Sequence, residues 1–334
     1  MNVLLSAVGR RAYLVKYFQD VVHPLGGKVY ATNTTPEATG FLIADEARVV
    51  PPSASSDYVD VMVELCKEWN VQLLFSLHDW DAPALARARD KFSSVGTILV
   101  MGQSEILTAC LDKYKMVKLM DGLGVRCPKT VLSIKDACAR LSFPLIVKPR
   151  WGQGSIGIFK VNALDELEAA VMFAERKARD FASRCPEIDQ TQPQVMIQEF
   201  ISAPEFGCDI VNDLSGRFRK AFVKRKFAMR SGETDAAESV DCPKIQEVAQ
   251  RVAKWSRHLG CMDSDWFFKD GDEPILIELN PRFGGGYPFS HCAGVNVPLA
   301  CINWAMGKDN EDWCKNFAVG VKTYKDISLF VKKY

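Results

Sequence analysis

Histidine is scarce in this sequence, cysteines are never paired, and neither sign of charge dominates. Only four histidines occur, and the eleven cysteines are scattered without a C-x-x-C pair. A zinc site or a disulfide framework is therefore not expected, and the cysteine pattern is typical of a reduced, cytoplasmic protein. Lys and Arg number 42 against 41 Asp and Glu, which gives a formal net charge of +1. Without a global field, any anionic ligand requires a local cluster of cations, and we expect no nucleic-acid partner.

Long hydrophobic runs are absent as well. The opening stretch MNVLLSAV is too short to cross a bilayer and lacks a signal-peptide cleavage pattern. We therefore predict a cytoplasmic protein without a membrane partner. At 334 residues the chain exceeds one ordinary core, so two or three packed modules are expected. The sequence leaves open whether the chain forms a homo-oligomer.

The first hundred residues alternate short apolar runs with segments of helical periodicity, which predicts a parallel, Rossmann-like α/β layer. A dinucleotide-binding site would need G-x-G-x-x-G after the first strand, but a single glycine is followed there by Arg10 and Arg11. The sequence therefore disfavours dehydrogenase chemistry. We expect strands at 2–8, 29–32, 73–77 and 97–101, and helices at 12–22, 57–69 and 82–93.

From about residue 104 short strands and glycine-rich turns dominate, which is typical of α+β structure. No internal repeat and no long low-complexity segment interrupts this part. We expect strands at 129–133, 145–149, 194–201, 206–213 and 217–226, helices at 163–182 and 243–259, and a final hairpin at 264–280.

That final hairpin carries paired acidic residues. Glu278 and Asn280 are two apart on a strand and so share a face. If residues 270–273 make the turn, Asp265 lies directly opposite Glu278, with the Cβ atoms ~5 Å apart. Two facing carboxylates on a buried sheet require a cation, and ligands that are all oxygen suit magnesium or manganese. The alternative is an exposed hairpin with solvated acids, although its apolar neighbours favour burial.

The segment after this strand favours an anion pocket. Arg282 is placed to meet phosphoryl or carboxylate oxygens, and the glycines at 284–286 let backbone N–H groups approach an anion closely. A flexible turn would explain the glycines. It would not explain the neighbouring carboxylates, amide and arginine.

Two further segments have the composition of a nucleotide site. The glycine-rich stretch 151–157 lacks the G-K-[ST] of a Walker A motif and alone would be a structural turn. Lys148 changes that interpretation, because a lysine inside an apolar strand is costly unless its ammonium meets an anion. The strand at 195–201, with Glu205 after it, offers backbone groups for an adenine edge and a carboxylate for ribose hydroxyls. Taken alone, this strand reads as an ordinary apolar strand with a polar end.

Taken together, Lys113, IVKPR with its glycine loop, QEFI with Glu205, and DSDWFF through IELNPRFGGG resemble the ATP-grasp superfamily. The motifs and their spacing most resemble those of one synthetase unit of the carbamoyl-phosphate synthase large subunit, biotin carboxylase and stand-alone carboxylate–amine ligases. The resemblance implies a Rossmann-like module at 1–103, a small ATP-grasp subdomain at 104–193 that carries the glycine-rich loop, and a large subdomain at 194–334 that carries the metal and substrate sites.

The resemblance also implies roles for individual residues. It places two magnesium or manganese ions on Asp265, Glu278 and Asn280, with Glu278 bridging them. Catalysis would involve Glu278, Asn280 and Arg282, the last of which steadies the transferred phosphoryl group. The nucleotide ATP would be bound by Lys113, Lys148, Gly152, Gly154, Ser155, Gly157, Glu199, Phe200, Ile201 and Glu205.

The activity implied is an ATP- and magnesium-dependent ligase that phosphorylates a carboxylate to an acyl phosphate and couples it to an amine, releasing ADP and phosphate. Its partners would be small-molecule acids and amines. Arg225, Arg230 and Gly285 are the candidate substrate-binding residues, while the lysines of the stretch 224–230 are equally well explained as a solvated basic strand. Two alternatives remain, namely a carboxylate- or bicarbonate-phosphorylating subunit of a carbamoyl-phosphate-synthase-like complex and a nucleotide-binding regulator without turnover.

Overall fold

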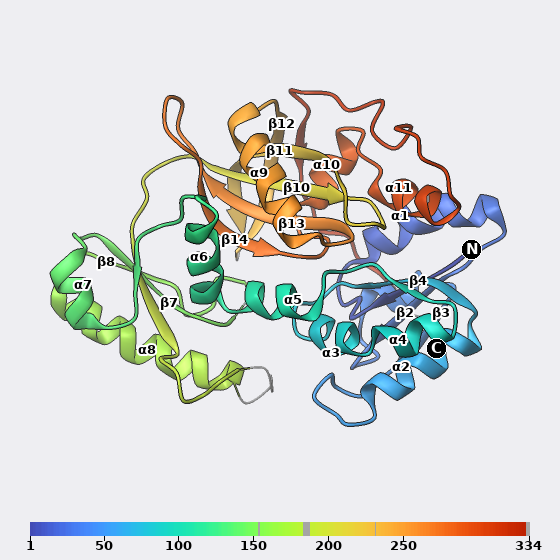
Figure 1. The fold of residues 1–334 in the computed structure, drawn as a ribbon, viewed down its shortest axis with the longest axis horizontal. Coiled ribbons are helices and arrows are strands. Elements are labelled where there is room, and N and C mark those ends of the chain that lie inside the picture. Colours follow the sequence, from blue (N-terminus) through green and yellow to red (C-terminus); the bar gives the residue numbers. More distant parts are fainter. Residues whose placement is uncertain (153, 183–187, 231, 332–334) are drawn as a thin grey trace.

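The computed structural model describes residues 1–152, 154–182, 188–230 and 232–331. Three β-sheets follow one another along its long axis (Figure 1). The N-terminal module lies at one end, a small subdomain with a four-stranded sheet lies at the other, and a six-stranded sheet lies between them. This arrangement confirms the predicted α/β fold with a parallel N-terminal sheet followed by antiparallel sheets. Within the described ranges no helix is both long and apolar enough to cross a membrane.

The N-terminal module contains a parallel sheet in the order β3-β2-β1-β4-β5. In its central strand Val3, Leu4 and Leu5 are 0 % exposed, because helices cover both faces of the sheet. Its strands are β1 (Asn2–Ser6), β2 (Val29–Asn33), β3 (Glu46–Val49), β4 (Val71–Ser76) and β5 (Ile98–Leu99). Its helices are α1 (Ala12–Val22), η1 (His23–Leu25), η2 (Thr39–Leu42), α2 (Tyr58–Glu68), α3 (Ala82–Arg87) and α4 (Arg89–Ser94). The sequence did not predict β3, whose side chains are mostly exposed at the sheet edge.

The small subdomain is an antiparallel sheet in the order β6-β9-β7-β8, backed by α8. Strand β9 pairs with both β6 and β7, so this sheet extends past the expected boundary at residue 193. Its strands are β6 (Thr130–Val131), β7 (Leu145–Pro149), β8 (Phe159–Val161) and β9 (Val195–Glu199). The helices of this part of the chain are α5 (Ser104–Leu111), α6 (Lys113–Gly122), α7 (Ile134–Arg140) and α8 (Leu164–Ala182).

The central sheet is antiparallel throughout, in the order β14-β13-β10-β11-β12-β15. Alternate residues pack beneath it against α6 and α9, as Cys208 and Ile210 do, while the residues between them face the opposite side. Its strands are β10 (Glu205–Asn212), β11 (Phe218–Arg230), β12 (Glu233–Val240), β13 (Gly260–Phe267), β14 (Ile275–Asn280) and β15 (Lys322–Tyr324). The remaining helices are α9 (Pro243–Ser256), α10 (Tyr287–Cys292) and α11 (Val297–Ala305).

Candidate functional site

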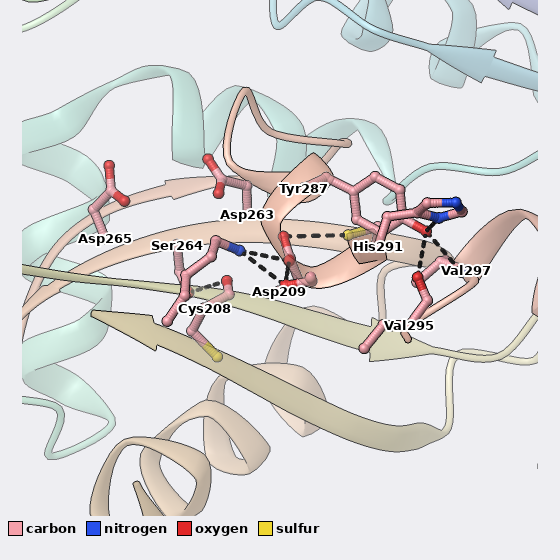
Figure 2. A network of polar contacts seen from close by, with 12 residues as sticks. Cys208, Asp209, Asp263, Ser264, Asp265, Tyr287, His291, Val295 and Val297 are labelled. Carbon is pink, nitrogen blue, oxygen red and sulfur yellow. Dashed lines mark hydrogen bonds and ion pairs between the residues drawn. The ribbon is translucent and has the colours of Figure 1, made fainter. Parts of the chain in front are cut away.

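The β13–β14 hairpin places acidic side chains opposite one another. Asp265 pairs with Glu278, which confirms the predicted register, and Asp263 pairs with Asn280. The register shifts next to Asp265, because Trp266 pairs with Leu276, so the strands depart from the simple count nearer the turn. Figure 2 shows Asp263 and Asp265 projecting from the same side of β13. The hairpin therefore presents three carboxylates and one amide to one region.

Lysine ammonium groups balance these carboxylates. Lys113 Nζ lies 3.1 Å from Glu278 Oε1, and Lys226 contacts both Asp265 and Glu205, the latter at 2.8 Å. Burial raises the pKa of Asp265 to about 7 although the Lys226 ammonium lies against it. Burial opposes ionisation of Glu278 too, but Lys113 and then Lys148 hold the pKa of that carboxyl below its usual value. The site therefore holds a dense cluster of both charges.

Lys148 is buried on β7 beside this cluster. Burial, together with the neighbouring Lys113 ammonium, lowers the pKa of Lys148 to about 8. Lys113 itself donates a hydrogen bond of 2.6 Å to the carbonyl of Gly152. Its backbone is held by the N-cap of α6, where the Asp112 carboxylate accepts from the first backbone N–H groups. Asp112 also forms an ion pair with Arg150, which ties α6 to the start of the glycine-rich loop.

The glycine-rich loop adopts backbone conformations that require its glycines. Gly152, Gly154 and Gly157 have φ of +145°, +62° and +77°, and Ser155 has φ of +57°. A Cβ added to Gly232, in the β11–β12 turn, would lie 2.7 Å from Ser155 Oγ. The loop therefore packs against that turn and covers the space between the four-stranded sheet and the six-stranded sheet.

A cavity of about 320 Å³ lies beneath this loop. We call it the nucleotide cavity, because most of the residues expected to bind ATP line it. The Glu205 carboxylate lines it, while the Glu199 carboxylate also accepts a hydrogen bond of 2.9 Å from the backbone N–H of Lys129. Gly157 is not part of its lining and packs on Pro149 and Lys177 instead. Among the expected nucleotide residues, those lining the cavity are Lys113, Lys148, Gly152, Gly154, Ser155, Glu199, Phe200, Ile201 and Glu205.

A second cavity of about 300 Å³ adjoins the nucleotide cavity, and we call it the central cavity. The two share Asp265, Glu278 and the loop residue Gly154 in their linings. Arg282 also lines the central cavity, and its guanidinium lies 2.7 Å from Asp79 in the N-terminal module. Burial opposes the charge of Arg282, but Asp79 raises its pKa above the usual value. The arginine is thus fully charged just after the end of β14.

A third cavity, of about 540 Å³, continues from the central one toward the N-terminal module. We call it the acceptor cavity, because Arg230 and Gly285, two of the residues expected to bind the substrate, line it. Arg10, Arg11 and Lys325 also line it. Arg11 and Gly285 line the central cavity as well. Burial and the nearby Arg282 guanidinium lower the pKa of Arg11. The structure thus brings Arg230 and Gly285 to one cavity.

Arg225 is not brought to any of these three cavities. It is exposed on β11, while Lys224 and Lys226 on either side of it point into the site. Lys224 is 1 % exposed and forms an ion pair of 2.5 Å with Asp209. Figure 2 shows Asp209 at the centre of this polar network. Strand alternation explains the outcome, because neighbouring residues on β11 must face opposite sides of the sheet.

The glycines after β14 have a packing reason that sequence reasoning did not find. A Cβ on Gly284 would lie 2.2 Å from the Asp263 carboxylate carbon, and one on Gly286 would lie 3.0 Å from Lys224 Cε. A side chain at Gly284 would require the Asp263 carboxylate to move, and one at Gly286 would crowd the buried Lys224 side chain. Sequence reasoning also missed Asp79, whose contact with Arg282 spans 203 positions. The alternation of Asp263 with Asp265 on one strand was a signal for Asp263, whereas nothing local indicated Asp79.

The donor chemistry of the hairpin fits a hard divalent cation. Asp265, Glu278 and Asn280 offer only oxygen ligands, as magnesium and manganese prefer, and Asp263 adds another carboxylate. Asn280 Nδ2 lies 3.4 Å from Asp263 Oδ2, so the amide oxygen is directed elsewhere. Across the described residues, no group of three or more His, Cys, Asp or Glu side chains is arranged as a metal site. In this structure Lys226 and Lys113 form ion pairs with Asp265 and Glu278, respectively.

Comparisons with known families decide where this fold belongs. Residues 3–100 match the family model of the PylC-like N-terminal domain, and residues 191–325 match the model described as ATP-grasp in the biosynthetic pathway with Ter operon. Residues 191–325 therefore belong to an ATP-grasp domain. This assignment confirms the resemblance found in the sequence motifs, and it accounts for a nucleotide-sized cavity between two antiparallel sheets.

Similar proteins include several ATP-grasp members. The carbamoyl phosphate synthase large chain of Thermoanaerobacter sp. (strain X514) is 26 % identical over 228 residues, which cover 63 % of this chain and 20 % of that one. The D-alanine–D-alanine ligase of Mycobacterium tuberculosis (strain H37Rv) is 27 % identical over 203 residues, covering 52 % and 50 %. A biotin carboxylase from Campylobacter jejuni, solved in complex with β,γ-ATP, has a TM-score of 0.73 at 16 % identity, covering 96 % and 74 %. The chain thus spans between a fifth and a half of these curated relatives.

Proposed function

We propose that this chain is an ATP-dependent ligase that phosphorylates a substrate carboxylate and couples the acyl phosphate to an amine, releasing ADP and phosphate. The observation that carries the proposal is the position of the facing carboxylates Asp265 and Glu278. They line both the nucleotide cavity and the central cavity. The buried Lys113 and Lys148 also line the first cavity, and Arg282 lines the second. This arrangement suits transfer of a phosphoryl group from a nucleotide to a second ligand.

The hairpin would hold magnesium or manganese, two ions in this proposal, through Asp265, Glu278 and Asn280. Such an ion, when bound, neutralises negative charge on phosphate oxygens. The protein itself contributes the remaining charge balance. Lys113 and Lys148 would hold the phosphates, and the glycine-rich loop, already packed on Gly232, would exclude water from them.

The first proposed step forms a bond between a carboxylate oxygen and the γ-phosphorus while the bond from that phosphorus to the β-phosphate oxygen breaks. ADP leaves with the electron pair. In the second step the amine nitrogen attacks the acyl carbon, inorganic phosphate departs, and the nitrogen gives up a proton. Arg282, held by Asp79, would steady the phosphoryl group in both steps. The acid and the amine would reach this centre through the acceptor cavity.

The test is a screen of ADP release against pairs of amino acids, hydroxy acids and amino sugars, followed by product mass. The proposal predicts that ADP release requires both an acid and an amine, and that the product mass equals their sum less one water. Equal ADP release without an amine would contradict the ligase proposal. It would favour a carboxylate-phosphorylating unit of a larger complex, which the similarity to a carbamoyl phosphate synthase large chain also supports.

A further inference from the structure

The loop between β4 and α3, residues 77–81, lies where the N-terminal module meets the site. It follows the carboxyl end of a central strand of the parallel sheet. His78 and Asp79 line a small cavity of about 20 Å³ whose other walls include Lys113 and Glu278. A cavity of this size holds about one water molecule. The loop is therefore packed closely against Lys113, the lysine proposed to hold phosphate, and against β14, the strand proposed to hold the metal.

Asp81 anchors this loop to its own module. Its carboxylate is buried and lies 2.6 Å from Ser76 Oγ and 2.8 Å from Ser6 Oγ. Tyr58 OH donates a third hydrogen bond at 3.1 Å. These hydroxyls come from β4, β1 and the start of α2, so one carboxylate joins three elements. A buried carboxylate with this many donors fixes the geometry of the segment that carries it.

Asp79, two residues earlier, holds the guanidinium of Arg282. The two side chains are 11 % and 12 % exposed and 2.7 Å apart. Burial alone would raise the pKa of Asp79, but Arg282 holds it below its usual value, so the pair is fully ionised. Arg282 also donates a hydrogen bond of 3.2 Å to the carbonyl of Phe283. Contacts from two sides therefore set the plane of the guanidinium.

Trp80, the next residue, reaches the opposite part of the site. Its ring packs edge-on against Phe181 of α8, with centroids 5.8 Å apart. A Cβ on Gly152 would lie 2.9 Å from the Phe181 ring, so that ring lies directly over the first glycine of the loop. Gly152 in turn accepts the hydrogen bond from Lys113. One aromatic contact thus connects the N-terminal module to the glycine-rich loop.

We propose that Asp79 and Trp80 are positioning residues through which the N-terminal module sets both parts of the site. Asp79 orients Arg282 for phosphoryl transfer, and Trp80 holds the glycine-rich loop over the nucleotide through Phe181. Because Asp81 fixes the loop to the N-terminal module, Asp79 can orient Arg282 while Trp80 on the same short loop holds the glycine-rich loop. This inference rests on the proposed function, because the effects of changing Asp79 and Trp80 are measured as changes in ATP turnover and in nucleotide affinity.

The first arm of the test replaces Asp79 with Asn in the full chain. We expect kcat for ADP release to fall by about 10- to 100-fold, as for other residues that orient a reacting group, with KM for ATP within about twofold. In an Arg282→Ala background the same change should have no further effect, because Asp79 acts through that arginine. Asp90→Asn, an exposed change in the same module, is the control and should leave both constants unchanged.

Asp79→Glu covers the case in which the Asn variant fails to fold. It keeps the charge but displaces the guanidinium, so we expect a reduced kcat with a near-normal melting temperature. A folded Asp79 variant with wild-type kcat would overturn this half of the proposal. So would an Asp79→Asn effect that persists unchanged in the Arg282→Ala background.

The second arm replaces Phe181 with Ala. Loss of one aromatic contact should raise KM for ATP, and the Kd for ADP measured by calorimetry with magnesium, by about three- to tenfold, while kcat at saturation changes little. Phe181→Leu should restore most of the affinity. Trp80→Ala should give a similar increase, and combining it with Phe181→Ala should add nothing. Phe173→Ala, half-exposed on the same helix, is the matched control.

These two arms distinguish failure of the inference from failure of the proposed function. A wild-type chain that binds ADP with magnesium but never couples an acid to an amine would overturn the ligase proposal, and calorimetry would still test Trp80 and Phe181. Wild-type turnover combined with additive Trp80 and Phe181 effects, or with none, would overturn the positioning role of Trp80 alone.

Discussion

The nucleotide cavity and the acceptor cavity are built from different kinds of structure. Strands β7, β9 and β14 form the walls of the first, and their side chains sit at positions fixed by hydrogen-bonded register. The second is enclosed by the β1–α1 turn, the loop after β4, the adjoining ends of β11 and β12, and the segment after β15. Turns and terminal segments vary in shape without disturbing a sheet. Under the proposed function, this difference would place the phosphoryl-transfer chemistry mainly on the sheets and the choice of substrate mainly on the connecting segments.

The largest effect expected from this comparison is at the hairpin. Glu278→Gln removes one of the two facing carboxylates while keeping its size, so ADP release should fall by about 10²- to 10³-fold, the range for losing one electrostatic contact to a transition state. The melting temperature should stay near the wild-type value. Glu273→Gln, an exposed change in the same hairpin, should leave the rate unchanged. Near-normal turnover of Glu278→Gln would remove this residue from the metal site.

Lys148→Ala should have the next largest effect, and it should concern the nucleotide cavity alone. Losing one charge-assisted contact to a phosphate corresponds to ~1.5–3 kcal/mol, so KM for ATP should rise about 10- to 100-fold with KM for the acid and the amine unchanged. Initial-rate kinetics with each substrate varied in turn checks this. Lys135→Ala, exposed on α7, is the control. An unchanged dependence on ATP would exclude Lys148 from the phosphate site.

The titration of Lys148 should make the use of ATP depend on pH. Because burial and Lys113 lower the pKa of Lys148 to about 8, the ammonium is present below that pH and is lost above it. The value of kcat/KM for ATP should therefore fall by about tenfold between pH 7 and pH 9. In Lys148→Arg the fall should disappear, and a fall of equal size in that variant would assign it to another group.

Regular elements with local signals could be predicted from the sequence. The period of two on a strand placed Glu278 beside Asn280, and a short hairpin placed Asp265 opposite, as the register confirms. The same period does not determine whether the odd-numbered or the even-numbered residues of β11 face the site. Arg225 was preferred there, whereas Lys224 and Lys226 are the residues that point inward.

Contacts between modules were beyond prediction. The ion pair of Asp79 with Arg282 joins residues 203 positions apart, and no periodicity in either segment encodes it. The acceptor cavity likewise combines the β1–α1 turn with residues 325–327, which no motif connects. Long-range proximity of this kind depends on how whole modules pack, and a single sequence carries no direct signal for it.

The smallest effect expected is at the acceptor cavity, where Arg230 lines the wall and is more than half exposed. An exposed guanidinium is well solvated, and Asp235, 2.8 Å away, already competes for it. Arg230→Ala should therefore raise KM for the acid or the amine by only about three- to tenfold, with KM for ATP unchanged. Arg225→Ala provides the matched control, since it removes the same charge from the same strand on the face away from the cavity. If both variants raise KM for the acid or the amine equally, long-range charge rather than a contact in the acceptor cavity determines the affinity, and the cavity would lose its assignment.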